Sequence, residues 1–239
     1  MERSEPSSRG TTRLVDNLAF RAWLSLAVLA AIMGALLFGC AGTLRYWQAW
    51  VYLALFFALS AVITADLLRH DPALLRRRMK GGPTAEGRPL QRVIMLGASL
   101  GFVSLLVIPA LDFRHGWSSV PVIFVAIGDV LFAMGFGFIG RVYRENTYSS
   151  ATVQVSADQR VVDTGPYAVV RHPMYASASL YLIGTPLALG SYCGFLGLAF
   201  MLPFLVWRLL DEERLLAREL PGYAAYQARV RYRLIPGLW

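Results

Sequence analysis

Charged residues are scarce in this sequence of 239 residues, and lysine is nearly missing. Asp, Glu, Lys and Arg together make up 16% of the chain, and Lys80 is its one lysine. Soluble proteins usually contain about 25% of these four residues. Hydrophobic residues make up 56% of the chain and stand in long uninterrupted runs. A water-soluble domain of this size could not bury that much apolar surface, so the composition indicates a protein that lies in a membrane.

Cysteine is also scarce, and the two that are present do not form a ligand pattern. Cys40 and Cys193 lie in or beside apolar runs and belong to no CxxC pair. A disulfide framework or a zinc site needs more such ligands at closer spacing. We therefore expect two buried or lipid-facing thiols and no metal site.

The apolar runs predict an all-α, polytopic transmembrane bundle. A run of about 20 residues matches the ~30 Å hydrocarbon core of a bilayer. Four such runs cover about 20–42, 46–65, 93–111 and 120–140. Two shorter runs, at about 176–189 and 194–207, are joined by a tight turn at 190–193. We expect about six helices, the last two forming a hairpin whose helices are somewhat longer than the runs.

The arginines predict the orientation of the bundle. All but two of the 23 basic residues stand in the N-terminal tail, the loop after the second run, the segment after the fourth run and the C-terminal tail. The other side keeps only Arg45 and Arg114. An even number of crossings then places both termini in the cytoplasm. The net charge of +8 therefore indicates membrane topology and contact with anionic lipids, and no nucleic-acid partner.

Two features of the fourth run invite functional interpretations. Gly135-Phe-Gly137-Phe-Ile-Gly140 matches the GxGxxG dinucleotide fingerprint, but that motif must follow a strand, and here it ends an apolar run. We interpret it as a small-residue face for tight helix packing. Asp129 is an acid within the run, and such residues are often functional. It supports an alternative of another class, a small membrane transporter.

Polar and aromatic residues gather in two segments on the predicted inner side. The first contains Gly165-Pro-Tyr-Ala-Val-Val-Arg-His-Pro-Met-Tyr175. Proline is favoured in the first turn of a helix, so Pro173 is predicted to open the fifth helix, whose N-terminus would suit a carboxylate group of a cofactor. In the second segment, Arg208 and Glu212 are spaced to share one helix face, either as a surface pair or as part of a site. The hairpin brings the two segments together.

These motifs resemble the isoprenylcysteine carboxyl methyltransferase family, whose relatives include membrane phospholipid methyltransferases. The resemblance rests on residues 165–175, the Glu212-Glu213 pair one hairpin later, and the Tyr223-x-x-Tyr226 to Pro236 stretch. It covers about residues 150–236. It implies a membrane methyltransferase that uses S-adenosyl-L-methionine as its cofactor. In this family the cofactor lies in a cytosolic pocket closed by the C-terminal segment, and the lipophilic substrate comes from the bilayer.

The resemblance also implies a set of site residues. Arg208 would bind the substrate carboxylate, and Glu212 would bind the amino or ribose groups of the cofactor; the spacing after the pair leaves open whether Glu212 or Glu213 makes this contact. The other residues expected to contact the cofactor are Gln159, Arg160, Val161, Val162, Tyr167, His172, Pro173, Met174 and Tyr175.

The chain is thus divided into three regions. Residues 1–19 are predicted to be a disordered tail, residues 20–140 a four-span scaffold, and residues 141–239 the catalytic region with its hairpin and cytosolic cofactor-binding segments. The Arg- and Ala-rich composition indicates a high-GC bacterial genome and an inner-membrane location.

The identity of the acceptor stays open. A carboxylate needs no general base at neutral pH, whereas an amine or thiol needs proton removal, for which Glu212, Glu213 or His172 are candidates. A prenylated protein is the eukaryotic substrate of the family that the chain resembles, and a small lipophilic molecule is the alternative in a bacterium. A sterol-reductase-like enzyme that uses a nicotinamide cofactor is a further alternative.

Overall fold

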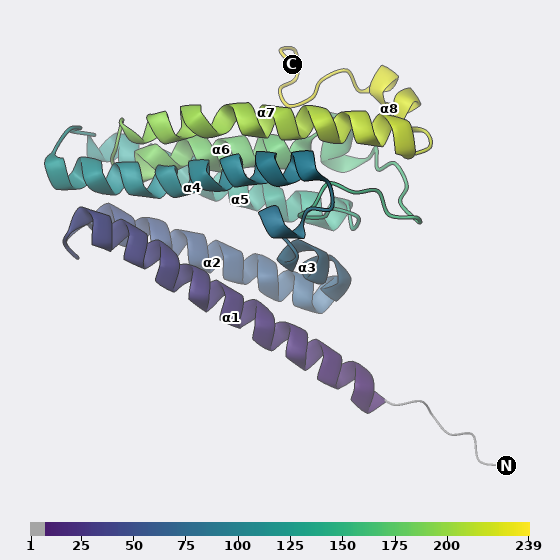
Figure 1. The fold of residues 1–239 in the computed structure, drawn as a ribbon, viewed down its shortest axis with the longest axis horizontal. Coiled ribbons are helices and arrows are strands. Elements are labelled where there is room, and N and C mark those ends of the chain that lie inside the picture. The colour runs from purple at the N-terminus through teal and green to yellow at the C-terminus, as the bar shows by residue number, and fades with distance from the viewer. Residues whose placement is uncertain (1–7) are drawn as a thin grey trace.

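The computed structural model describes residues 8–239 as a bundle of helices (Figure 1). The helices are α1 (Ser8–Ala41), α2 (Trp47–His70), α3 (Pro72–Met79), α4 (Pro89–His115), α5 (Val122–Glu145), α6 (Pro173–Ala188), α7 (Gly194–Glu219) and α8 (Tyr223–Arg229), with 3₁₀ turns η1 (Pro83–Ala85) and η2 (Gly165–Ala168). No strand occurs in the described residues. The predicted all-α class is confirmed.

Within residues 8–239, five helices are long and apolar enough to cross a bilayer: α1 from Asn17 onward, α2, α4, α5 and α7. The predicted hairpin is present as α6 and α7. Helix α6 begins at Pro173, as predicted, and has 16 residues, so it is shorter than the other five. It ends where Gly190 adopts a positive φ of 66° and the chain reverses, a conformation that glycine adopts without strain.

The N-terminal tail differs from the prediction. Residues 1–7 lie outside the described part of the chain. From Ser8 onward the chain is helical and continues into α1, so the expectation of disorder is wrong for residues 8–19. Once a helix is nucleated, each further residue adds a hydrogen bond at little entropic cost, and no proline interrupts this stretch.

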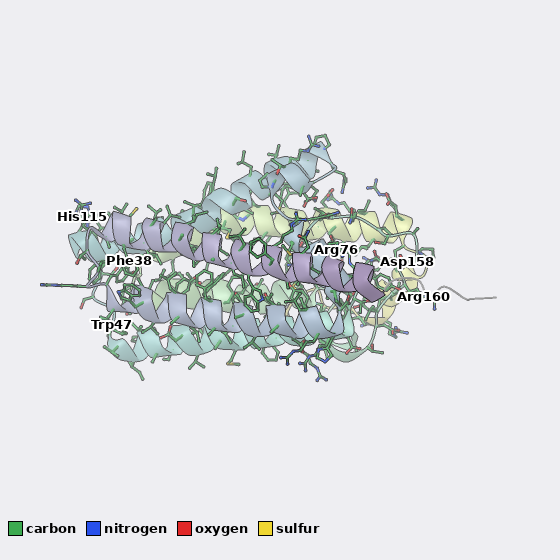
Figure 2. All side chains as sticks on the ribbon, turned by 90° about the horizontal axis from the view of Figure 1, so that it is seen from below. Phe38, Trp47, Arg76, His115, Asp158 and Arg160 are labelled. Carbon is green, nitrogen blue, oxygen red and sulfur yellow. The ribbon has the colours of Figure 1, made fainter. Side chains whose placement is uncertain are left out.

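The polar ends of the helices gather at one end of the bundle. The start of α1, the short helix α3 and helix α8 all lie at this end (Figure 1). A second view places Arg76, Asp158 and Arg160 toward the same end, and Phe38, Trp47 and His115 at the other (Figure 2). The segregation of the arginines therefore corresponds to a real polarity of the fold. We call this the arginine-rich end.

Glycines bring two helix pairs into close contact. A Cβ added to Gly128 would lie 2.3 Å from the backbone nitrogen of Ala188, and one added to Gly135 would lie 2.7 Å from that of Tyr181. Helices α5 and α6 are thus packed backbone to backbone. Gly97 and Gly101 similarly face Phe204 and Met201 of α7, at 2.3 Å and 2.5 Å. Gly135 of the GxGxxG stretch, and Gly97 and Gly101 of α4, therefore serve helix packing.

The GxGxxG stretch provides a matched pair of variants. Gly135→Ala should destabilise the protein by about 1–3 kcal/mol or more, because the new methyl group meets fixed backbone atoms. Gly137 has open space around its Cβ direction, so Gly137→Ala should be neutral or slightly stabilising. Thermal unfolding midpoints of the detergent-solubilised variants test this expectation. Equal midpoints for the two variants would contradict the packing role of the motif.

Candidate active site

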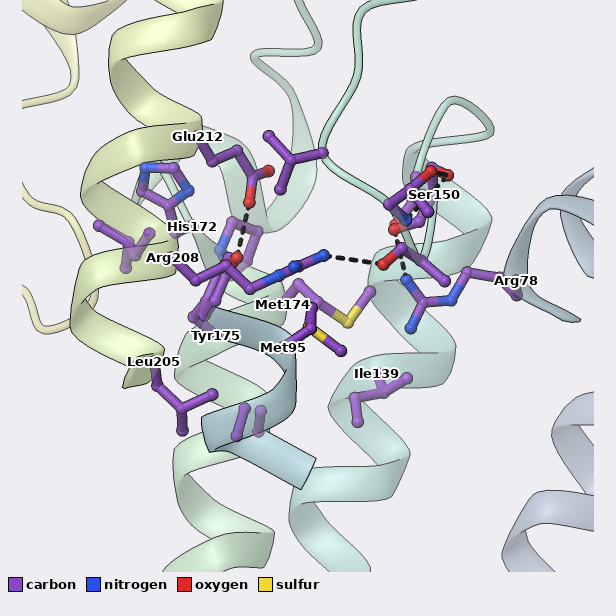
Figure 3. Close-up of a pocket in the computed structure, with 18 of the residues that line it drawn as sticks. Arg78, Met95, Ile139, Ser150, His172, Met174, Tyr175, Leu205, Arg208 and Glu212 are labelled. Atoms are coloured by element: carbon purple, nitrogen blue, oxygen red, sulfur yellow. Dashed lines mark hydrogen bonds between the residues drawn. The ribbon is translucent and has the colours of Figure 1, made fainter. Parts of the chain in front are cut away.

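A cavity of about 650 Å³ opens among α1, α4, α5, α6 and α7 at the arginine-rich end. Its polar part is lined by the α5–α6 connection, the first turn of α6 and the inner half of α7 (Figure 3). Its apolar part extends along α1 and α4, lined by Leu29, Ile32, Met33, Leu36, Phe102, Val103 and Leu106. The cavity therefore joins a polar compartment to an apolar one inside the bundle.

The predicted site residues all meet at this cavity. The residues of the α5–α6 connection and of the start of α6 come from one continuous segment, and those of α7 come from the other arm of the hairpin. The structure lines the cavity with Gln159, Arg160, Val161, Val162, Tyr167, His172, Pro173, Met174, Tyr175, Arg208 and Glu212. Their roles toward a ligand remain predictions.

Glu212 faces the cavity and is held by Tyr175. The hydroxyl of Tyr175 donates a hydrogen bond of 2.6 Å to Oε2 of Glu212. The two residues meet because Tyr175 stands in the first turn of α6 and Glu212 near the end of the antiparallel α7 (Figure 3). Glu212 lines the cavity, whereas Glu213 does not. Of the two adjacent acids, Glu212 is therefore the one at the cavity.

Glu213 fastens the C-terminal segment to the hairpin. Its Oε1 accepts from Nε of Arg171 at 2.6 Å, and its Oε2 accepts from Nε of Arg233 at 2.8 Å. The backbone N–H groups of Arg171 and His172 donate to the carbonyls of Tyr232 and Arg233, each at 2.9 Å. The segment after α8 is therefore held across the start of α6, where Leu234 and Trp239 line the cavity.

His172 is nearly buried, with 5% of its surface exposed. Its Nε2 lies 3.6 Å from Oε1 of Glu213 and has no hydrogen-bond partner within the described residues. Its ring packs edge-on against Tyr175, with ring centroids 5.8 Å apart. The imidazole therefore belongs both to the cavity wall and to the contact that holds the C-terminal segment.

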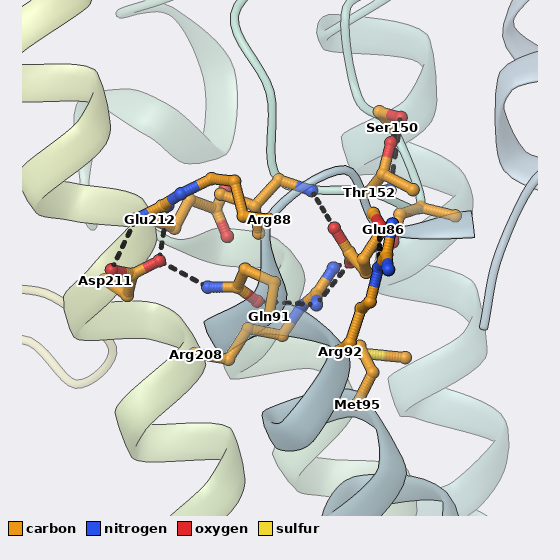
Figure 4. A network of polar contacts seen from close by, with 12 residues as sticks. Glu86, Arg88, Gln91, Arg92, Met95, Ser150, Thr152, Arg208, Asp211 and Glu212 are labelled. Carbon is orange, nitrogen blue, oxygen red and sulfur yellow. Dashed lines mark hydrogen bonds and ion pairs between the residues drawn. The ribbon is translucent and has the colours of Figure 1, made fainter. Parts of the chain in front are cut away.

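Arg208 lines the cavity but is already neutralised by an acid from another part of the chain. Its Nη1 donates to Oε1 of Glu86 at 2.7 Å and to Oε1 of Gln91 at 3.0 Å (Figure 4). Its Nη2 donates to the carbonyl of Ala151 at 2.8 Å. Arg208 is 8% exposed and Glu86 is 1% exposed. The sequence predicts that Arg208 binds a substrate carboxylate. Such a carboxylate would have to share the guanidinium with Glu86.

The same network extends to Asp211, which lies one helical turn after Arg208 on α7. Asp211 accepts from Nη1 of Arg88 at 2.6 Å and from Nε2 of Gln91 at 2.5 Å (Figure 4). Glu86 also accepts from the backbone N–H of Val153 at 3.2 Å. Glu86, Gln91 and Asp211 were not predicted from the sequence, because the first two lie in and after a polar loop that carries no motif. The network therefore holds residues 151–153, which form part of the cavity wall, against α7.

Tyr167 presents a neutral hydroxyl. The side-chain amide of Asn146 donates to this hydroxyl at 2.9 Å, and the hydroxyl of Tyr226 donates to the backbone carbonyl of Tyr167 at 2.7 Å. Burial raises the pKa of Tyr167 to about 12, so the phenol stays protonated at neutral pH. Since Asn146 is the donor, the hydrogen of Tyr167 remains free to donate to a ligand.

No group of three or more His, Cys, Asp and Glu side chains within residues 8–239 is arranged to hold a metal ion. At the cavity, Glu212 presents a carboxylate and Tyr167 presents a hydroxyl.

Residues 123–221 match the family model described as phospholipid methyltransferase. This segment, which is less than half of the chain, is similar to that family. It runs from α5 through both arms of the hairpin, and so contains Tyr167, His172, Tyr175, Arg208 and Glu212. The match agrees with the resemblance to membrane methyltransferases found in the motifs. The five long apolar helices support an integral membrane protein.

A solved structure resembles the whole chain more loosely. It is the structure of the eukaryotic intramembrane Ras methyltransferase, isoprenylcysteine carboxyl methyltransferase, with 20% sequence identity and a TM-score of 0.48. The similarity covers 97% of this chain and 87% of that one. No curated protein matches the sequence.

Proposed function

We propose that this protein transfers a methyl group from S-adenosyl-L-methionine to a lipophilic acceptor, and that the acceptor is a carboxylate. The observation that carries this proposal is a cavity that joins the polar residues of the segment similar to the family to an apolar compartment between α1 and α4. A polar donor and an apolar acceptor can meet in such a space.

The polar part fits the proposed cofactor. Glu212 offers a carboxylate to an ammonium group, Tyr167 offers a hydroxyl, and residues 159–162 line the wall. The cofactor would supply an already activated methyl group on a sulfonium. The protein then needs to hold and orient the two reactants and exclude water, which is the task of the C-terminal segment fastened by Glu213.

The apolar part fits an acceptor from the bilayer. Ile32 on α1 and Val103 on α4 both line the cavity, and they are 52% and 40% exposed on the outside of the bundle. This supports access from lipid between these two helices. A carboxylate acceptor fits a cavity lined by four arginines and one acid, Glu212. Methylation of a lipid amine or of a small thiol is the alternative.

The location follows from the same proposal. We place both termini and the cavity at the cytoplasmic face of a bacterial inner membrane, since the arginine-rich end corresponds to the inner side. Membrane lipids and the acceptor are then the partners of the protein. A transporter would instead use Asp129, which does not line the cavity.

Calorimetry with S-adenosylhomocysteine on the detergent-solubilised protein tests the proposal. We expect saturable binding to one site. Radiolabelled methyl transfer to a lipid extract, compared with consumption of NADPH, separates a methyltransferase from a reductase. If S-adenosylhomocysteine does not bind and no lipid accepts the label, the proposed function is wrong.

A further inference from the structure

The cavity contains more positive charge than its own acids neutralise. Among the described residues, four arginines line it, Arg78, Arg160, Arg171 and Arg208, whereas Glu212 is the one acid there. Two of these arginines have carboxylate partners outside the cavity: Glu213 lies 2.6 Å from Arg171, and Glu86 lies 2.7 Å from Arg208. Arg160 is exposed at the arginine-rich end (Figure 2).

Arg78 is different from the other three. It stands in the last turn of α3 and is half-buried. Its Nη1 donates to the carbonyl of Ser150 at 2.7 Å, and its guanidinium lies 5.2 Å from the ring centroid of Tyr143. Within the described residues, no carboxylate lies within ion-pair distance of Arg78. These contacts orient the guanidinium without neutralising its charge.

The location of Arg78 is the boundary between the two compartments. Figure 3 shows Arg78 beside Ser150 and near Ile139, across the cavity from Glu212 and His172. Ser150 belongs to the polar wall, while Ile139 and the lining residues of α1 belong to the apolar part. A molecule that occupies the apolar part with a chain would therefore present its polar headgroup close to Arg78.

The chemistry of this position selects one kind of headgroup. A guanidinium that is partly removed from water and lacks a counter-ion attracts an anion more strongly than a solvated one does. Its planar donors match a carboxylate in a bidentate geometry. The neighbouring cation, Arg208, is already paired with Glu86.

We propose that Arg78 binds the carboxylate of the acceptor and makes the enzyme selective for amphiphiles that combine this group with an apolar chain. The inference rests on the proposed function. Methylation forms an O–CH₃ bond and breaks the S–CH₃ bond, whose electron pair stays on sulfur. The carboxylate becomes a neutral ester, so the product loses its attraction to Arg78 and is released more readily than the acceptor.

A binding experiment with a charged and an uncharged probe tests the role of Arg78. The probes are a pyrene-labelled long-chain fatty acid and its methyl ester, added to the full-length protein in an uncharged detergent and saturated with S-adenosylhomocysteine. The wild type should bind the acid at least about 10-fold more tightly than the ester. Arg78→Gln should abolish this preference, and Arg78→Lys should restore part of it.

The control variant is Arg76→Gln, because Arg76 is exposed on the same helix and should leave the preference unchanged. Equal binding of acid and ester by the wild type, or an unchanged preference in Arg78→Gln, would overturn the inference. A loss of acid and ester binding by the same factor would also overturn it, since it would show that Arg78 only supports the wall. Calorimetry with S-adenosylhomocysteine on each variant separates these outcomes from failure of the proposed function itself.

Discussion

Replacing Glu212 by Gln is expected to weaken the binding of S-adenosylhomocysteine by about 10- to 100-fold. Hydrogen bonds to charged groups contribute about 1.5–3 kcal/mol, and each 1.4 kcal/mol changes an affinity about tenfold. Gln keeps the shape of the side chain and removes the negative charge that we propose faces the cofactor's ammonium group. Isothermal titration calorimetry on the detergent-solubilised variant measures the change directly.

Two further variants sharpen this test. Tyr175→Phe removes the hydroxyl that donates to Glu212 at 2.6 Å but leaves the charge, so we expect a loss of only a few-fold. Glu219→Gln is the matched control, because Glu219 is an exposed acid on the same helix and does not line the main cavity. An unchanged affinity in Glu212→Gln would exclude Glu212 from the cofactor site.

Replacing Glu86 by Ala should lower the free energy of unfolding by about 3–5 kcal/mol. Removal of one partner of a buried ion pair leaves the other charge buried and uncompensated, and Glu86 and Arg208 are 1% and 8% exposed. Glu86 also accepts from the backbone of Val153, so the cavity wall at 151–153 should loosen as well. Thermal unfolding in detergent, monitored by size-exclusion chromatography, gives the change in the unfolding midpoint.

An exposed ion pair provides the comparison. Arg144 and Asp66 are 2.9 Å apart, but the Arg144 side chain is 71% exposed. We expect Asp66→Asn to change stability by at most about 1 kcal/mol. The double variant Glu86→Ala with Arg208→Met should recover part of the stability lost in Glu86→Ala, because it removes the unpaired charge. A single Glu86 variant as stable as Asp66→Asn would contradict the importance of the buried network.

Two helical segments, α3 and residues 8–19, were not predicted from the sequence. Helix α3 was expected to be a loop, although Asp71-Pro72 is a helix-start pattern and Asp71 accepts from the backbone N–H of Leu74 at 2.8 Å. The sequence contains this cap, but the arginines that follow it indicated a polar loop. For residues 8–19 the polar composition indicated disorder. In the structure these residues are helical, because the helix of the adjoining span continues through them.

The sequence by itself determined the membrane character, the spans, the polarity of the bundle and the two motif segments that meet at the cavity. These features depend on local composition and spacing, which hydropathy and motif patterns express directly. Only the tertiary structure decided the partners of the charged groups. Arg208 pairs with Glu86 across 122 positions of the chain, Glu213 rather than Glu212 holds the C-terminal segment, and Arg78 is brought to the cavity by α3. Such contacts arise from helix packing between distant segments, and no local pattern records which charge will lie opposite another.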